Sequence, residues 1–173
     1  MSENKDHLAD FSTGDVIKVH SGQLDGFRNI AMQNPGKKRY RLCLHDSPDN
    51  ALQEMLICVT KGDYSRPHKH VGISESHHIV DGKERIILFD DDGNVTDSFV
   101  LDRKSGYISY RINSEVYHMS VPLTETVIKL EVKAGPFTPG SNIFPDWAPD
   151  GEDTGEAEKY VNAVMTGIEH LEN

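Results

Sequence analysis

Between residues 39 and 133 the chain repeats one pattern, a short run of β-prone residues followed by turn residues. The runs are residues 39–45, 52–60, 76–80, 85–89, 95–101, 107–112, 116–121 and 126–133. Several of them alternate polar with apolar side chains, as a strand with one buried face does. Turn dipeptides such as Asp81-Gly82 and Ser105-Gly106 separate them. Short strands at even spacing predict an all-β sandwich or barrel.

The segments on either side of these runs have other patterns. Residues 1–38 mix apolar positions with glycines, which predicts an irregular or short-stranded N-terminal lead-in. Residues 135–152 are rich in proline and glycine and are expected to form a surface loop. Beyond them an apolar stripe recurs at spacings of three and four: Ala157, Tyr160, Val161, Val164, Met165, Ile168 and Leu171. This stripe predicts an amphipathic helix, capped by Asp153 or Thr154 and packed on the barrel or on a partner subunit. The expected division is lead-in 1–38, barrel 39–134, and loop with helix 135–173.

Charge and hydropathy argue against two classes of partner. The formal net charge is −10, and a polyanionic nucleic acid is repelled by such a surface unless a local basic patch intervenes. We interpret the basic residues of 37–41 as a solvated face. No apolar run approaches the roughly 18 residues needed to span a bilayer, and no basic stretch followed by an apolar one marks a signal peptide. We therefore expect a cytoplasmic protein with neither nucleic acid nor membrane as a partner.

The chemistry-bearing residues are concentrated between residues 62 and 82. His68 and His70 are two apart, and alternate side chains of an extended chain share a face. Gly72 allows the chain to double back, so that Glu75 approaches the same point from the next strand. Imidazole and carboxylate ligands together suit one divalent transition metal, namely iron, manganese, nickel, zinc or copper. A fourth ligand has two sources, the pair His77-His78 and the later His118.

The spacing around these residues resembles the cupin superfamily. Gly62, His68, His70, Glu75 and Gly82 match every fixed position of the first cupin motif. The second motif is degraded: between Gly106 and His118, Ile112 and Ser114 stand where that motif has proline and glycine. The histidine also comes one residue late, and the final asparagine is missing. The resemblance implies a jelly-roll β-barrel with a metal held by His68, His70, Glu75 and His118.

Further segments resemble the WbuC family of cupin metalloproteins. They are RLCLHDSPD at 41–49, QEML at 53–56, YSRPHKH at 64–70, LFDDDG at 88–93, GPF at 135–137 and WAP at 147–149. The similarity covers about residues 39 to 150. That family is associated with bacterial surface-polysaccharide gene clusters, and its reaction is not established. The resemblance therefore implies a metal site without supplying a substrate.

Parity along the strands gives the remaining candidates. If Glu75 points inward, so does His77, either as an acid or base near the metal or as filler of the barrel mouth. Tyr64 and Arg66 share the parity of His68 and are candidate catalytic residues. Arg66 would fix a carboxylate or phosphate of a substrate, or else form a surface salt bridge. A second group follows from the same reasoning: Arg41 and His45 are expected to line one cavity, and Glu131 to form a structural ion pair with one of the arginines.

These features predict a metal-binding cupin that is an enzyme acting on a small polar molecule. By the family resemblance, that molecule is a sugar or sugar nucleotide of surface-polysaccharide biosynthesis. The expected reaction is isomerisation or epimerisation with the metal as a Lewis acid. Two alternatives stay open, an iron-dependent oxygenase and a non-catalytic module that senses a ligand or a metal. Cupins often pair, so a homodimer is expected.

Overall fold

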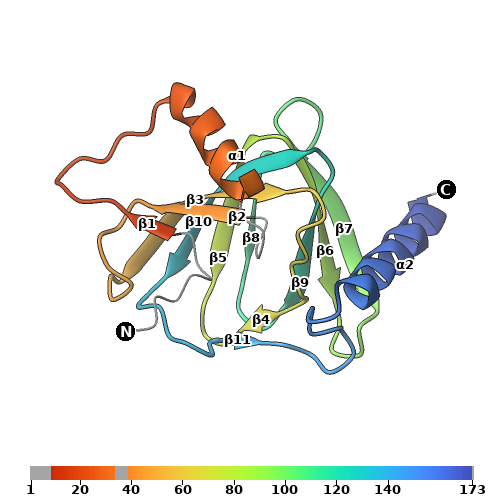
Figure 1. The fold of residues 1–173 in the computed structure, drawn as a ribbon. Coiled ribbons are helices and arrows are strands. Elements are labelled where there is room, and N and C mark those ends of the chain that lie inside the picture. Colours follow the sequence, from red (N-terminus) through yellow and green to blue (C-terminus); the bar gives the residue numbers. More distant parts are fainter. Residues whose placement is uncertain (1–8, 34–38, 173) are drawn as a thin grey trace.

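The computed structural model describes residues 9–33 and 39–172, and within them strands dominate (Figure 1). The largest sheet has the order β1-β2-β3-β10-β5-β8. Its strands are β1 (Ala9–Phe11), β2 (Arg39–Cys43), β3 (Leu52–Thr60), β10 (Thr126–Ala134), β5 (Glu75–Asp81) and β8 (Ser109–Ile112). A second sheet has the order β7-β6-β9, with β7 Val95–Asp102, β6 Lys83–Phe89 and β9 Tyr117–Pro122. A third pairs β11 (Asn142–Ile143) with β4 (Lys69–His70).

The prediction of a mainly β fold is confirmed, because every predicted run overlaps a strand. The two-residue strands β4 and β11 were not predicted, since so short a segment carries no periodicity. In the described residues no ladder of paired strands joins the six-stranded sheet to the three-stranded one. Isolated bridges His68–His118 and Leu101–Tyr107 link segments near their edges. Two sheets that face each other across a core are shown, whereas a continuous closed barrel is not.

The lead-in holds a helix that the sequence analysis did not predict. After a short 3₁₀ turn at Ser21–Gln23, α1 runs over Leu24–Gln33 and lies over β2 and β3 (Figure 1). Phe27 and Ala31 on its buried face pack against Tyr40, Leu56 and other residues of the outer face of the large sheet. The expectation of an irregular segment was therefore wrong for 24–33. Gly26 inside the helix lowers helix propensity by about 1 kcal/mol, which obscured the pattern; packing on the sheet compensates.

The C-terminal helix is confirmed. The helix α2 spans Thr154–Glu172, and the Asp153 side chain accepts hydrogen bonds from the backbone N–H groups of Gly155 and Glu156. Its apolar stripe packs on β6 and β9 of the three-stranded sheet, with Ile168 fully in the core beside Ile87 and Met119. Of the predicted stripe, the Leu171 side chain lies outside the described residues. Neither helix among the described residues has the length and apolarity to cross a membrane.

The inner face of the large sheet positions the polar residues. The central core between the two sheets includes Met55, Ile57 and Val59 of β3 together with Ile86 and Leu101 of the facing sheet. Strand β10 lies between β3 and β5, and its register places Glu131 opposite Met55 on one side and His77 on the other. Charged side chains therefore share a face with the core, at one end of it.

Candidate metal centre

Three segments bring the predicted metal ligands together. His70 belongs to β4, Glu75 begins β5, and His118 belongs to β9. Between His70 and Glu75, Gly72 adopts φ 72°, a left-handed conformation that favours glycine and reverses the chain as predicted. His68 directly precedes β4 and bridges to His118 through backbone hydrogen bonds, so these two imidazoles lie with ring centroids 4.5 Å apart.

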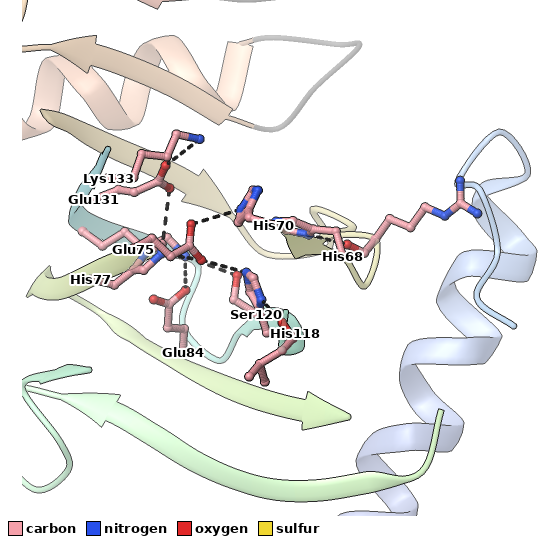
Figure 2. A network of polar contacts seen from close by, with 12 residues as sticks. His68, His70, Glu75, His77, Glu84, His118, Ser120, Glu131 and Lys133 are labelled. Carbon is pink, nitrogen blue, oxygen red and sulfur yellow. Dashed lines mark hydrogen bonds and ion pairs between the residues drawn. The ribbon is translucent and has the colours of Figure 1, made fainter. Parts of the chain in front are cut away.

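The four side chains converge on one point (Figure 2). One potential ligand atom from each of His68, His70 and His118 lies within 4.8 Å of the others. Glu75 joins them: its Oε1 is 2.8 Å from His118 Nε2 and its Oε2 is 3.3 Å from His70 Nε2. Glu75 and His70 are each only 4% exposed. Three imidazoles and one carboxylate form the donor set that the sequence predicted.

Backbone carbonyls fix the orientation of two imidazoles. His68 Nδ1 lies 2.9 Å from the carbonyl oxygen of Arg66, and His118 Nδ1 lies 2.9 Å from that of Val116. A carbonyl only accepts, so each Nδ1 carries a proton, and Nε2 is the nitrogen whose lone pair can bind a metal. Neither ring nitrogen of the buried His70 has a hydrogen-bond partner among the described residues. A divalent transition metal would satisfy these lone pairs, so the residues fit such an ion.

Electrostatics keeps the ligands in the protonation states that a metal requires. Burial, together with the neighbouring His118, lowers the pKa of His68 to about 3. Burial raises the pKa of the Glu75 carboxyl, but its close contacts with the imidazoles of His118, His70 and His77 outweigh burial and hold this pKa well below its usual range. A neutral imidazole and an ionised carboxylate are the metal-binding forms.

His77 and Glu131 extend the polar cluster away from the imidazoles. His77 is buried and faces inward, while His78 is exposed, as the parity argument predicted. Its Nε2 lies 3.3 Å from Glu75 Oε1 and 4.0 Å from Glu131 Oε2, and its ring stacks on Tyr110 at 4.9 Å between centroids. Glu75, His77 and Glu131 form a second group of side chains that could hold a metal ion.

Tyr64 and Arg66 do not face the cavity with His68, contrary to the expectation from strand parity. The Tyr64 hydroxyl donates to the carbonyl of Pro149 at 2.9 Å, and Arg66 donates to that of Pro145 at 3.1 Å. The Arg66 guanidinium also lies over the Phe144 ring. Both side chains fix the loop that follows β11, and neither lines the cavity described next. Residues 61–67 are not in a strand, so alternation does not govern their direction.

The cluster opens into a cavity of about 130 Å³. Its lining includes Arg41, as predicted, but not His45, whose Nδ1 instead accepts from the backbone N–H of Glu54. Glu131 is paired with Lys133 at 3.5 Å rather than with an arginine. Three cations of the lining were not predicted, namely Arg39, Lys129 and Lys133. In the sequence these cations stand at every second position of a strand. A strand face exposed to solvent has the same pattern, so the pattern does not identify a cavity.

Comparisons with known proteins support the fold without giving a function. Residues 19–101 match a family described only as a domain of unknown function, DUF6016. No curated protein matches the chain significantly. The structure of CapF with the inhibitor 3-isopropenyl-tropolone is similar with a TM-score of 0.51 and 15% identity, over 62% of this chain and 31% of CapF. This likeness shows a cupin-like fold and no more.

Two further solved structures are similar at lower TM-scores. The Lactobacillus farciminis oxalate decarboxylase formate complex has a TM-score of 0.45 and 19% identity, over 55% of this chain and 27% of that one. Procruciferin, an 11S globulin from Brassica napus, has a TM-score of 0.43 and 12% identity, over 50% and 21%. The chain therefore spans less than a third of the length of each of these proteins.

Proposed function

We propose that the chain is a metal-dependent enzyme in which His68, His70, Glu75 and His118 hold one divalent transition metal. The observation that carries this proposal is the convergence of three imidazoles and one buried carboxylate at a polar cavity. Iron, manganese, nickel, zinc and copper all suit this donor set. When bound, the metal supplies Lewis acidity toward an oxygen of the substrate.

His77 is the residue that we assign to proton transfer. Its Nε2 lies between Glu75 and Glu131, and Tyr110 holds the ring by stacking. Neither ring nitrogen has a hydrogen-bond partner among the described residues, so the imidazole is available to take or give a proton. Glu131 would stabilise the imidazolium form. Removal of a proton from carbon and its return to that carbon or a neighbouring one are the steps of an isomerase or epimerase.

The substrate class follows from the cavity and from the family resemblance. A relationship to the WbuC family supports a sugar or sugar nucleotide of surface-polysaccharide biosynthesis. The cavity of about 130 Å³ is smaller than the roughly 300 Å³ at which pockets for drug-sized ligands begin. Only one end of a sugar nucleotide would therefore enter it, and we favour a small polar molecule. Cytoplasmic location and assembly as a homodimer remain predictions.

The first experiment measures metal in purified protein. Elemental analysis should find about one transition metal per chain in the wild type and little in the double variant His68→Ala/His70→Ala. His78→Ala is the matched control, because this exposed histidine lies on the strand β5 that begins with Glu75. Retention of full metal content by the double variant would contradict the site.

A second experiment separates an enzyme from a sensor. Metal-loaded protein is incubated with small sugars, hydroxy acids, keto acids and nucleotide sugars, and the mixture is followed by mass spectrometry and by exchange of substrate protons for solvent deuterium. Deuterium incorporation that requires both the metal and His77 would support proton transfer. Saturable binding without exchange or turnover across the panel would favour a sensing module.

A further inference from the structure

Nearly all cations that line the cavity have a carboxylate partner. Arg39 Nη2 lies 2.6 Å from Asp63 Oδ2, and Lys129 Nζ lies 2.8 Å from Glu84 Oε2. Lys133 is paired with Glu131 as described above. These three pairs neutralise themselves within the protein, so they leave no charge for a ligand to compensate.

Arg41 differs from the other lining cations. It lies on β2 directly opposite Ile57 of β3, so its side chain shares the inner face of the sheet. Among residues 9–33 and 39–172, no acceptor lies within hydrogen-bond distance of its guanidinium, although that group carries five N–H donors. Burial lowers the pKa of Arg41, and the neighbouring Arg39 lowers it further. Arg41 is half-buried and lines the cavity, so its N–H donors are available to an oxyanion that enters there.

The carboxylates of the cavity already have partners other than Arg41. Asp63 accepts from Arg39, Glu131 lies beside Lys133 and His77, and Glu75 belongs to the imidazole cluster. Among the described residues Arg41 is therefore the lining cation without a paired carboxylate, although Glu131 and Asp63 lie close enough to raise its pKa. A divalent metal on the imidazole cluster would add further positive charge, because the single carboxylate there cannot neutralise it.

We propose that Arg41 binds the carboxylate or phosphate group of a small acid, whose other end faces the imidazole cluster. The planar guanidinium fork matches such an oxyanion in a bidentate arrangement. Binding of the acid group by Arg41 does not depend on a metal. The orientation of the other end of the acid toward the metal rests on the proposed function.

The strand order fixes how such an acid lies. From Arg41 on β2 the inner face runs across β3 and β10 to His77 on β5, which is about 14 Å along the sheet at about 4.8 Å per strand. The long arginine side chain spans part of this distance. A molecule of a few carbons fits the remainder and the cavity volume, with an acid at one end and a hydroxyl or carbonyl at the other. Hydroxy acids, keto acids and their phosphorylated counterparts have this form.

The test is titration calorimetry with malonate, glycolate and inorganic phosphate, using malonamide and glycolamide as uncharged counterparts. We expect at least one acid to bind the wild type, the amides not to bind, and Arg41→Gln to weaken binding at least tenfold. Arg41→Lys should retain part of the affinity, because it keeps the charge and loses the fork. Arg111→Gln is the matched control, since Arg111 is exposed on β8 and does not line the cavity.

Two further measurements separate this proposal from the metal site. Arg41→Gln should keep the metal content of the wild type and unfold at the same or a higher temperature, which shows that it folds. Chelator-treated wild type should still bind the acid through Arg41, with lower affinity. Equal binding by Arg41→Gln and wild type, binding of the amides, or no binding of any acid would overturn the proposal. Preference between malonate and phosphate identifies the oxyanion.

Discussion

The backbones of His68 and His118 are hydrogen-bonded in both directions: His68 N–H donates to His118 O at 3.1 Å, and His118 N–H donates to His68 O at 3.0 Å. Through this bridge His118, at the end of the degraded second motif, lies beside His68 of the intact first motif. Their ring positions follow from the backbone pairing rather than from the residues that surround His118 in sequence. The missing proline, glycine and asparagine of the second motif therefore do not displace this histidine.

Removing the imidazole of His118 should release the metal without unfolding the protein. We expect His118→Ala to lower metal affinity by more than the roughly 10- to 100-fold that loss of an outer partner of a ligand costs. The measurement is competition with a chromogenic chelator, with circular dichroism to confirm the fold and His78→Ala as control. Unchanged affinity would mean that the metal is held by the other group, Glu75, His77 and Glu131.

His77 should be needed for chemistry and dispensable for metal binding. We expect His77→Gln to retain about one metal per chain and to lose exchange of substrate protons with solvent, because the ring that transfers the proton is gone. Metal content and deuterium incorporation are measured on the same sample. If wild type holds about two metals per chain and His77→Gln one, His77 is a ligand and its assignment to proton transfer fails.

Tyr64 should contribute to stability only. Its hydroxyl donates to the carbonyl of Pro149, so Tyr64→Phe should lower the free energy of unfolding by about 1 kcal/mol. Metal content should not change, because Tyr64 does not line the cavity. Denaturant unfolding gives the first quantity and elemental analysis the second. Tyr107→Phe, at a residue 64% exposed, is the control and should change neither. Loss of metal in Tyr64→Phe would show that Tyr64 contributes to the metal site and would contradict this prediction.

The carboxyl of Asp102 should make stability depend on pH. Hydrogen bonds from Lys83, then from Ser105 and the backbone of Lys104, hold the pKa of Asp102 well below its usual range. A depressed folded-state pKa stabilises the fold above the unfolded-state value of about 3.9, and the effect is lost as the pH falls toward the folded-state pKa. Asp102→Asn should therefore be less stable than wild type at pH 7, by a margin that shrinks below about pH 3.9.

Denaturant unfolding from pH 7 to pH 2.5 checks this dependence. Asp97→Asn is the control, because Asp97 lies on the same strand β7 and is exposed. A difference between Asp102→Asn and wild type that stays constant over this range would show that the carboxylate charge contributes nothing.

Local spacing predicted the parts of the site that one stretch of chain builds. His68, His70 and Glu75 lie within eight residues and are joined by a turn that Gly72 permits, so alternation alone brings them together. His77 followed from the same alternation inside β5. Tyr64 was misplaced because alternation stops where the strand stops. The sequence cannot show that boundary when a short strand such as β4 follows it.

The sequence could not show whether charged residues on a strand face solvent or a cavity. Arg39 and Arg41 alternate with apolar residues, and a solvated face has the same pattern. Which face meets water depends on what covers the other one, and here α1 covers the outer face of β2 and β3. The helix was itself unpredicted, since Gly26 weakens its local signal. Because this helix was missed, Arg39 was taken for a surface residue although it lines the cavity.

The pairing of β11 with β4 makes the segment after the last long strand a wall of the site. Asn142 pairs with His70 and lines the cavity, and Phe144 lies 6.0 Å from the ring of His68. This wall consists of β11 and the loop after it, which Tyr64 and Arg66 hold, and it lies outside the two larger sheets. Its residues can change without disturbing the pairing of the long strands. Selectivity among ligands can therefore diverge between related chains by exchange of this one loop, while the metal donors and the core stay fixed.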